Sequence, residues 1–274
     1  MKKLLTILAV LLVSTSAFAW DQVPPGAIQN CQAQVPYGVP QATKKVTLIC
    51  RHAYVSAFDE QAKIPNWVSY TLVPNHALGC VPRSNAFEAD ASIKNSPTPQ
   101  DYAGSGFDKG HNADDGDMSF DNQAELESFL MTNMSPQAPS LNRGTWKLLE
   151  TSVRAWAYEI NQPLTVYIGN LYDANDKTIG HGVVIPHALF KIVIDDSTNQ
   201  YAAWLFPHVK PYPNLGTDLT KYRVTVAQIE QLSGIKFPLP QGATELAVGK
   251  EWPVDFGKLT KAKKATCGAH ATVD

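Results

Sequence analysis

The sequence has only four cysteines, and no two of them show the Cys-x-x-Cys spacing of a zinc or redox site. It contains no Gly-x-Ser-x-Gly and no His-Glu-x-x-His segment, which argues against a serine hydrolase and a zinc protease. After residue 13 no apolar run reaches the length of a membrane span. Flexible or charged linkers and internal repeats are also missing, so residues 20–274 are expected to form one domain.

The first 19 residues have the three-part layout of a secretory signal peptide. Lys2 and Lys3 precede an apolar run over residues 4–13, and Ala17-Phe18-Ala19 supplies small residues for cleavage. We therefore expect cleavage near Ala19 and a mature protein that is periplasmic or secreted, with no membrane anchor. In such an oxidising compartment the cysteines are expected to form two disulfides.

Sequence alone leaves open the three ways of pairing Cys31, Cys50, Cys80 and Cys267. A bridge to Cys80 would steady the segment that carries Arg83.

The formal net charge is −2 for the whole chain. Loss of Lys2 and Lys3 leaves 21 of the 23 Lys and Arg residues against 25 Asp and Glu, a net charge of −4. This argues against a protein that coats nucleic acid through bulk charge, but a local basic groove is still compatible with it. The candidate groove residues, some of which are expected to be ordinary surface charges, are Arg83, Lys109, Arg143, Lys147 and Arg154.

Runs of β-branched and aromatic residues predict strands, and their order without strict βα alternation favours an α+β fold with a central antiparallel sheet flanked by helices. A loop over 57–63 is expected between the first two strands, and a turn over 196–200 between the last two. A short helix over 226–232 should stop at Gly234, and residues 258–264 read as a solvated basic tail. The predicted strands span residues 46–50, 66–73, 164–169, 190–195 and 201–206.

The stretch from Phe107 to Glu150 contains the residues whose side chains could carry out catalysis. His111 can titrate near neutral pH and lies beside Lys109, a cation suited to phosphate. Asn142, Trp146 and Glu150 are spaced four and four, which on one helix would place an amide oxygen and a carboxylate on the same side. An apolar face follows at Trp146, Leu149, Val153, Trp156 and Ile160. The acidic run 114–117 lacks the ligand spacing of a calcium loop and is expected to be an exposed loop.

At Asp108-Lys109-Gly110-His111 and the Asn-containing segment after it, the sequence resembles the sugar-non-specific DNA/RNA endonucleases, whose signature is Asp-Arg-Gly-His. Segments 51–54, 66–70, 201–206 and 222–226 also look like family segments in family order. The resemblance implies a ββα-metal active-site motif. It also implies Mg²⁺ as cofactor, with Mn²⁺ as a substitute, and cleavage of DNA and RNA to 5′-phosphorylated products.

The resemblance implies a role for each matching residue. His111 would be the general base, Asn142 the direct metal ligand, and Glu150 would hold the metal through water. Arg83 and Lys109 would bind phosphate, although lysine replaces the more common arginine at 109 and loses its planar fork. Asn133 would support the site by hydrogen bonding, and Asp108 would brace the turn or Lys109.

Other readings of single residues stay open. Asn142 could cap a helix, and His111 could be a structural histidine. Gly110 is expected to permit a tight turn before His111. Asn170, where many relatives have proline, should change only the local backbone.

The rival interpretation is a secreted relative that binds nucleic acid without cleaving it. Such a protein would be expected to lose His111, Asn142 or Glu150, and all three are present. The sequence leaves open the preference for single or double strands and the oligomeric state, a homodimer included.

Overall fold

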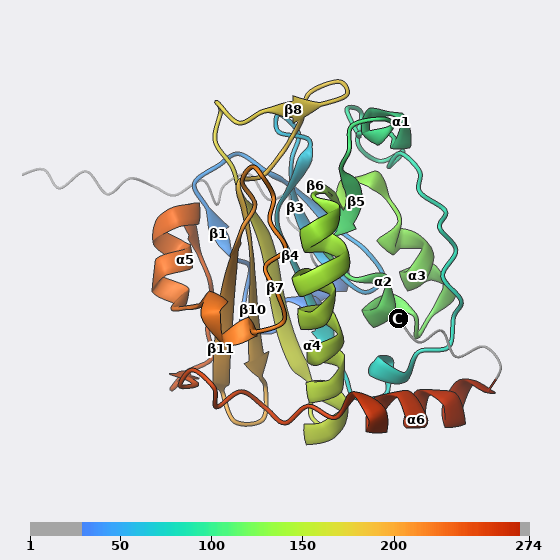
Figure 1. The fold of residues 1–274 in the computed structure, drawn as a ribbon, viewed down its shortest axis with the longest axis vertical. Coiled ribbons are helices and arrows are strands. Elements are labelled where there is room, and N and C mark those ends of the chain that lie inside the picture. The colour runs from blue at the N-terminus through green and yellow to red at the C-terminus, as the bar shows by residue number, and fades with distance from the viewer. Residues whose placement is uncertain (1–28, 269–274) are drawn as a thin grey trace, which may run out of the picture.

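The computed structural model describes residues 29–268 and is built on an eight-stranded sheet, seen nearly edge-on in Figure 1. The expected leader, residues 1–19, lies outside the described residues. Neighbouring strands follow the order β12-β11-β10-β7-β4-β3-β2, and β14 pairs with β11. Every pair is antiparallel except β11 with β14. The strands are β2 (Thr47–Cys50), β3 (Val55–Asp59), β4 (Ile64–Leu72), β7 (Leu164–Leu171), β10 (Ala188–Asp195), β11 (Gln200–Pro207), β12 (Arg223–Val224) and β14 (Thr244–Glu245).

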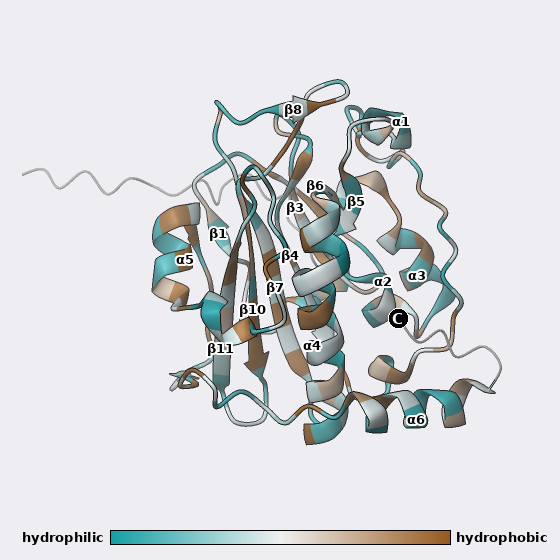
Figure 2. Ribbon diagram, viewed as in Figure 1, coloured by the Kyte–Doolittle hydropathy of each residue, from teal (hydrophilic) through white to brown (hydrophobic). Residues whose placement is uncertain are grey.

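The central strands are buried on both faces, so alternate side chains supply two separate hydrophobic cores. On β10, Leu189 and Val193 enter the core beneath helix α4 (Lys147–Ile160), whereas Phe190 and Ile192 enter the core beneath α5 (Val226–Ser233). The two helices therefore cover opposite faces of the sheet (Figure 1). Hydrophobic residues concentrate on the central strands, while hydrophilic ones colour the loops and much of the helical surface (Figure 2). The α+β class with a central antiparallel sheet is confirmed.

Most expected elements are present. The strand at 164–169 lies within β7, and the β10–β11 pair aligns Asp195 with Gln200 across the predicted turn. Helix α5 begins after a Thr225 cap and ends at Gly234, whose φ of 69° is the left-handed conformation that glycine tolerates. The apolar face of α4 is confirmed, because Trp146, Leu149, Val153 and Trp156 are buried and Ile160 packs against them.

The loop expected at 57–63 is wrong in its first part. Val55–Asp59 form β3, which lies between β2 and β4, so these three strands make a meander. Ala57 and Phe58 are fully buried between two neighbouring strands, and the chain reverses only at residues 60–63, where Lys63 takes a positive φ of 58°.

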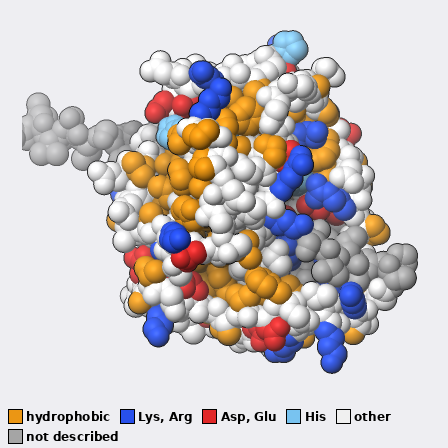
Figure 3. Space-filling view, viewed as in Figure 1, with side chains coloured by type: hydrophobic (Ala, Val, Ile, Leu, Met, Phe, Trp, Pro, Cys, Tyr) orange, Lys and Arg blue, Asp and Glu red, His pale blue; other side chains and the backbone are white. Residues whose placement is uncertain are grey.

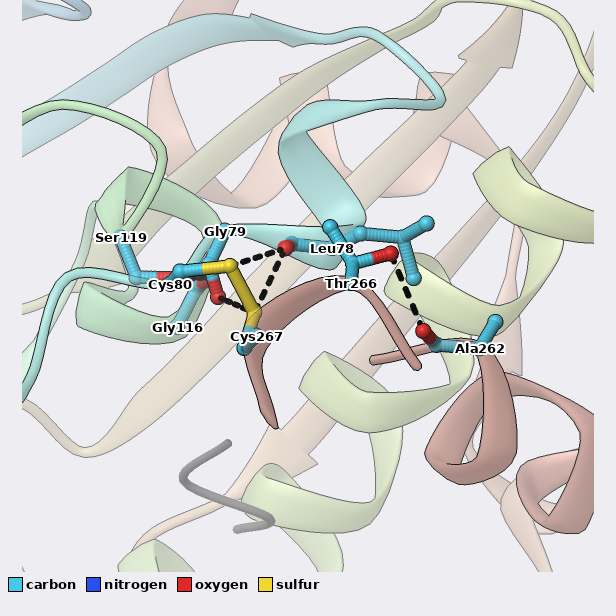
Figure 4. Close-up of a disulfide and its surroundings, with 8 residues drawn as sticks. All are labelled: Leu78, Gly79, Cys80, Gly116, Ser119, Ala262, Thr266 and Cys267. Atoms are coloured by element: carbon cyan, nitrogen blue, oxygen red, sulfur yellow. Dashed lines mark hydrogen bonds between the residues drawn. A yellow bond between two sulfur atoms is a disulfide. The ribbon is translucent and has the colours of Figure 1, made fainter. Parts of the chain in front are cut away.

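The solvated tail expected at 258–264 is also wrong. These residues belong to α6 (Phe256–Cys267), in which Leu259, Lys263 and Cys267 recur at a spacing of four and are buried. A disulfide joins Cys267 to Cys80, at the end of the segment that follows η3 (His76–Leu78), and Figure 4 shows this link. The second disulfide joins Cys31 to Cys50. The structure thus selects one of the three pairings.

Smaller elements surround the sheet, and no helix within residues 29–268 is long and apolar enough to cross a membrane. They are η2 (Gln29–Gln34), β1 (Gln41–Ala42), α1 (Pro99–Tyr102), β5 (Asp108–His111), α2 (Asp115–Met118), α3 (Asn122–Ser128), η4 (Met131–Asn133), β6 (Met134–Gln137), η5 (Leu141–Trp146), β8 (Thr178–Ile179), β9 (Val183–Val184), η6 (Leu219–Tyr222) and β13 (Ile235–Lys236).

Candidate active site

The site is built on a two-stranded ribbon followed by a helix. β5 and β6 pair antiparallel, with Gly110 opposite Ser135 and His111 opposite Met134, and the chain then enters η5 and α4. Gly110 lies within a strand and not in the tight turn that was expected. A Cβ atom there would come within 2.2 Å of the Gln137 side chain, so close packing explains the glycine.

His111 is buried between two aromatic rings. Its ring meets Phe129 edge-on at 4.8 Å between centroids and lies 5.7 Å from Phe87. Nε2 is buried and has no hydrogen-bond partner among the described residues, whereas a purely structural buried histidine would be expected to have one. Burial, reinforced by the charges of Arg83 and Lys109 and opposed by Asp114, lowers the pKa of His111 to about 3. The imidazole is therefore neutral at pH 7, which is the protonation state that a general base must have before it takes a proton.

The two cations meet the same pair of rings. The Arg83 guanidinium carbon lies 4.9 Å from the Phe129 centroid, and Lys109 Nζ lies 4.5 Å from the Phe87 centroid. Phe87 and Phe129 themselves pack edge to face at 4.8 Å. Arg83 and Lys109, expected from sequence to bind phosphate, are thus brought together with His111.

Arg83 is held in place by neighbours on its own loop and on α2. It donates to Asn85 Oδ1 at 2.9 Å and forms an ion pair with Asp115. The following residue, Ser84, donates its backbone N–H to Glu125 at 2.8 Å. The Arg83 side chain keeps 37% of its surface exposed, so it can still meet an anion from solvent.

Asn142 occupies a turn that is separate from α4. Residues 141–146 form a π-helical turn, and Gly144 inside it has non-helical φ and ψ of −114° and −111°. The expected continuous helix from Asn142 to Glu150 is therefore wrong in its first turn, because the backbone departs from helical geometry at Gly144.

The Asn142 side chain contacts β5 and caps no helix. Its Nδ2 donates to Asp108 Oδ2 at 3.0 Å, so the helix-cap alternative is wrong. Only the amide nitrogen can donate to a carboxylate, which leaves the amide oxygen directed elsewhere as a potential ligand. Asp108 also accepts two bonds from Arg143, at 2.8 and 2.6 Å, and these draw η5 onto the strand that ends at His111.

Glu150 is buried in the first turn of α4 and accepts no hydrogen bond from the described residues. Burial, and next to it the charge of Asp114, raise the pKa of Glu150 well above its usual range. Lys191 and Arg154 act in the opposite direction. A nearby metal ion would lower the pKa of Glu150 more strongly than these two cations do.

The acidic run at 114–117 is buried, contrary to the expectation of an exposed loop. Asp114 precedes α2 and pairs with Arg154, and Asp117 accepts from Tyr70 at 2.5 Å and from Arg154 at 3.1 Å. Arg154 is therefore committed to buried carboxylates and is not a groove residue of the open surface. Lys191 on β10 completes the cluster, fully buried with Nζ 4.8 Å from the Trp146 ring centroid.

Asn133 braces the backbone that follows His111. Its Nδ2 donates to the carbonyls of Ala113 and Ser128 at 2.9 and 2.8 Å, and its Oδ1 accepts from the Ala113 N–H at 2.9 Å. These bonds use most of the hydrogen-bonding capacity of the Asn133 side chain, so Asn133 positions neighbouring residues and does not bind a ligand itself.

Asn112 and Asn170 extend this hydrogen-bond network and were missed from sequence. Asn112 donates to the Asn133 carbonyl at 2.8 Å, and Asn170 donates to Asn112 Oδ1 at 3.1 Å and to the Pro65 carbonyl at 2.8 Å. The expectation that Asn170 changes only the backbone is therefore wrong. The available signal was the position of Asn112, directly after His111.

Asn142 and Glu150 offer hard oxygen donors, which suit Mg²⁺ or Mn²⁺. Within residues 29–268 neither the amide oxygen of Asn142 nor the carboxylate of Glu150 accepts a hydrogen bond, so both oxygens are chemically suited to an ion that keeps most of its own waters. A different set, Asp173, Asp176 and His187, brings its ligand atoms within 4.8 Å of one another. There, however, the His187 ring and the Asp173 N–H both contact the Asp176 carboxylate, so these bonds already explain the arrangement.

Comparison with known proteins identifies the family. The sequence profile described as DNA/RNA non-specific endonuclease matches residues 32–241. A nuclease of Serratia marcescens is 30% identical over 242 residues, covering 83% of this chain and 86% of that protein. A nuclease of a Nostoc species is 30% identical over 206 residues, covering 69% of this chain and 72% of that protein. The chain spans 59% of the length of mouse mitochondrial nuclease EXOG, at 26% identity over 73% of its own length.

The fold agrees with this assignment. The crystal structure of an EndoG/EndoGI complex superposes with a TM-score of 0.70 at 24% identity, covering 80% of this chain and 96% of that one. The chain belongs to the DNA/RNA non-specific endonuclease family. It is accordingly a hydrolytic endonuclease, from a family whose members depend on a metal.

Proposed function

We propose that the mature protein is a secreted, Mg²⁺-dependent endonuclease that cleaves DNA and RNA with little preference for sequence or sugar and leaves 5′-phosphate ends. The observation that carries the proposal is His111, buried and neutral between Phe87 and Phe129, with Arg83 and Lys109 on the same two rings. A neutral base beside two cations is the combination that phosphodiester hydrolysis requires.

His111 takes a proton from the water that attacks phosphorus in line. The new bond joins the water oxygen to phosphorus, and the bond from phosphorus to the 3′ oxygen breaks. Arg83 and Lys109 neutralise the non-bridging phosphate oxygens as charge develops on them. Because these groups grip phosphate and not bases or 2′-hydroxyls, both DNA and RNA are accepted.

Asn142, directly, and Glu150, through water, would hold the metal ion. Bound there, the ion supplies Lewis-acid stabilisation of the phosphate and of the departing oxygen. Asp108 orients the Asn142 amide, and Asn133 fixes the backbone beyond His111, so both act through other residues.

The leader and the one-domain organisation are part of the proposal. Residues 1–19 would be removed and residues 20–274 would act as a single unit. Two disulfides within the described residues support passage through an oxidising compartment. Mass spectrometry of protein recovered from the periplasm or the medium should give an N-terminus at Trp20, whereas a mature chain that retains Met1 would contradict this part.

The chemistry is tested by incubating plasmid DNA and RNA with the purified protein, with Mg²⁺ or with EDTA, beside His111→Ala. His52→Ala is the matched control, since its side chain is about half exposed and, within residues 29–268, forms an ion pair with Asp121 alone. Wild type and the His52→Ala control should cut both polymers in Mg²⁺. The His111→Ala variant, and wild type in EDTA, should cut neither. Products should accept a kinase label only after phosphatase treatment, as 5′-phosphates require. Binding without cleavage would instead establish the non-catalytic alternative.

The metal ligands have a test that does not depend on cleavage. Calorimetric titration with Mn²⁺ should show one site in wild type that is lost or greatly weakened in Asn142→Ala. Asp176→Asn should leave that site intact, because Asp176 belongs to the separate set around His187. The reverse result would move the metal to Asp173, Asp176 and His187.

A further inference from the structure

A buried histidine outside the catalytic cluster contacts the backbone that leads to Asn142. His208 comes directly after β11 and is only 3% exposed. Its Nε2 accepts a hydrogen bond from the Ala138 backbone N–H at 2.7 Å, and its Nδ1 lies 2.6 Å from the Pro186 carbonyl oxygen. His208 therefore joins the residue that follows β6 to the end of the central sheet.

These two hydrogen bonds fix the tautomer of the His208 ring. A backbone N–H can only donate and a carbonyl oxygen can only accept, so Nε2 carries no proton and Nδ1 carries one. Burial lowers the pKa of His208 below the usual value of about 6.5, with the bond to the Pro186 carbonyl acting in the opposite direction. The imidazole is thus a single neutral tautomer at pH 7, with both of its nitrogens in use.

Ala138 begins the backbone turn that carries Asn142. Its carbonyl oxygen accepts from the N–H groups of Leu141 and Asn142, both at 2.9 Å. His208 therefore holds the N–H of the same residue whose carbonyl holds the backbone of Asn142. Ala138 is itself buried, so without His208 its N–H would have to find another acceptor. A shift of the backbone to reach one would carry Asn142 with it.

His208 also contacts the strand that orients the Asn142 side chain. Its ring meets Phe107 edge-on at 5.9 Å between centroids and lies 4.9 Å from the Tyr212 ring. Phe107 directly precedes Asp108, whose carboxylate accepts from the Asn142 amide. One imidazole thus supports both the backbone and the side-chain partner of Asn142.

The segment that carries His208 is well anchored. Ser140 donates its hydroxyl to the Tyr212 carbonyl at 2.7 Å, and Thr145 donates to the Gly216 carbonyl at 2.6 Å. Leu215 packs against the core beneath α4. In Figure 1 the chain after β11 descends on the left of α4, and hydrophobic side chains gather on that side of the face shown in Figure 3. The segment can therefore act as a fixed support for the turn.

We propose that His208 is a positioning residue of the metal site, which holds the Asn142 turn in the arrangement that binds the ion. The inference rests on the function proposed above, in which Asn142 is the direct metal ligand. His208 acts through Ala138 and Phe107 and is not itself a ligand. Its effect is preorganisation, because a ligand that is already held loses less conformational freedom when the ion binds.

Calorimetric titration with Mn²⁺ tests this role without measuring cleavage. His208→Leu keeps an apolar side chain and loses both hydrogen bonds, whereas the amide of His208→Gln can accept from Ala138 and donate to Pro186. Mn²⁺ binding should weaken about 10–100-fold in His208→Leu and stay close to wild type in His208→Gln. Wild-type affinity in His208→Leu would overturn the proposal. Equal losses in the two variants would do so too, because the hydrogen bonds would then not be the cause.

Val209→Ala is the matched control for these two variants. It changes the next residue of the same segment, and the Val209 side chain is 52% exposed. This variant should bind Mn²⁺ as wild type does. A loss as large as that of His208→Leu would show that any change in the segment disturbs the site, and the specific role of His208 would be refuted.

Cleavage kinetics separate positioning from a general loss of structure. His208→Leu should need about 10–100-fold more Mg²⁺ for half-maximal cleavage. At saturating Mg²⁺ its kcat should approach that of wild type, and KM for DNA should change little. If kcat is instead lowered equally at every Mg²⁺ concentration, His208 is only structural and the proposal fails.

A measurement on the wild-type protein decides the matter should His208→Leu fail to fold. In ¹⁵N spectra of the metal-free protein, His208 should show a protonated Nδ1 and an unprotonated Nε2. Hydrogen exchange of the Ala138 amide should slow when Mg²⁺ is added, because the coupling between ion and hydrogen bond is reciprocal. A protonated Nε2, or an exchange rate that does not respond to Mg²⁺, would contradict the proposal.

The outcomes distinguish this inference from the proposed function. Wild-type protein that binds no Mn²⁺, or that keeps its Mn²⁺ site in Asn142→Ala, refutes the metal ligands proposed above. Wild-type protein that binds Mn²⁺ through Asn142, beside His208→Leu with unchanged affinity, refutes only the role of His208.

Discussion

The buried, neutral state of His111 predicts a specific dependence of folding stability on pH. The perturbation is His111→Asn, compared with wild type by urea unfolding of the metal-free protein at pH 8 and pH 5. In the unfolded chain the histidine pKa is about 6.5, whereas in the folded protein burial and the neighbouring cations lower it to about 3. Between these values the unfolded chain binds a proton that the folded protein excludes. The free energy of unfolding must therefore fall as the pH drops from 8 to 5.

The magnitude follows from linkage. At 1.36 kcal/mol for each pKa unit, a folded pKa of about 3 gives a loss of about 2 kcal/mol at pH 5 relative to pH 8. The result barely depends on the folded value, because at pH 5 any folded pKa below about 4 leaves the imidazole almost fully neutral. His111 is only 7% exposed, so solvent screening calls for little discount.

Other groups titrate over the same range, and the comparison of two proteins removes them. Burial and Asp114 raise the pKa of Asp117 to about 6, so protonation of Asp117 favours the folded protein as the pH falls, with a sign opposite to that of His111. Since Asp117 is present in both proteins, its contribution cancels in the difference. Wild type should lose about 2 kcal/mol more than His111→Asn. Equal losses in the two proteins would refute the reasoning, because folded His111 would then bind protons as readily as the unfolded chain.

Three further changes test the packing around the site, each measured by urea unfolding. Replacing Cys80 and Cys267 with serine should cost up to about 5 kcal/mol, since the bridge spans 187 residues; an unchanged midpoint would show that α6 is held without it. Gly110→Ala should cost about 1–3 kcal/mol through the clash with Gln137, and no loss would mean that Gln137 moves aside. Lys191→Met should cost about 3 kcal/mol at pH 8 and less at pH 5, where protonation relieves the buried acids; a larger cost at pH 5 would contradict that account.

The reactive residues could be found from sequence because their signal is local. His111 and Lys109 lie two residues apart in one short motif, and Glu150 lies on a helix with a regular apolar face. The longer strands of the sheet, among them β7 and β10, were predicted for the same reason, since these two are nearly continuous runs of buried apolar residues. Strand β3, whose residues were assigned in part to a loop, was not predicted. Local patterns of this kind need no knowledge of distant neighbours.

The missed features depend on contacts between distant segments. The acidic run at 114–117 looked exposed because isolated carboxylates rarely enter a protein interior. It is buried because Arg154, about 40 residues further along the chain, crosses over from α4 to pair with Asp114. Lys263 likewise looked like part of a solvated tail until α6 packed against α4 and Cys267 met Cys80. Cysteine pairing has the same origin, since spacing alone does not choose among partners.

The protonation states of the site residues are harder to predict from the sequence than the residues themselves, because a shared cluster of charges sets their pKa values. Asp114, Asp117 and Glu150 face two cations, Arg154 and Lys191, so the cluster carries one excess negative charge when every group is ionised. The raised pKa values of Asp117 and Glu150 show how the metal-free protein accommodates that excess, by favouring the protonated acids. A cation held by Glu150 would instead balance the excess negative charge directly and so stabilise the ionised form of the carboxylates. Metal uptake should therefore release protons, and a proton count from calorimetry in buffers of different ionisation enthalpy would measure the coupling.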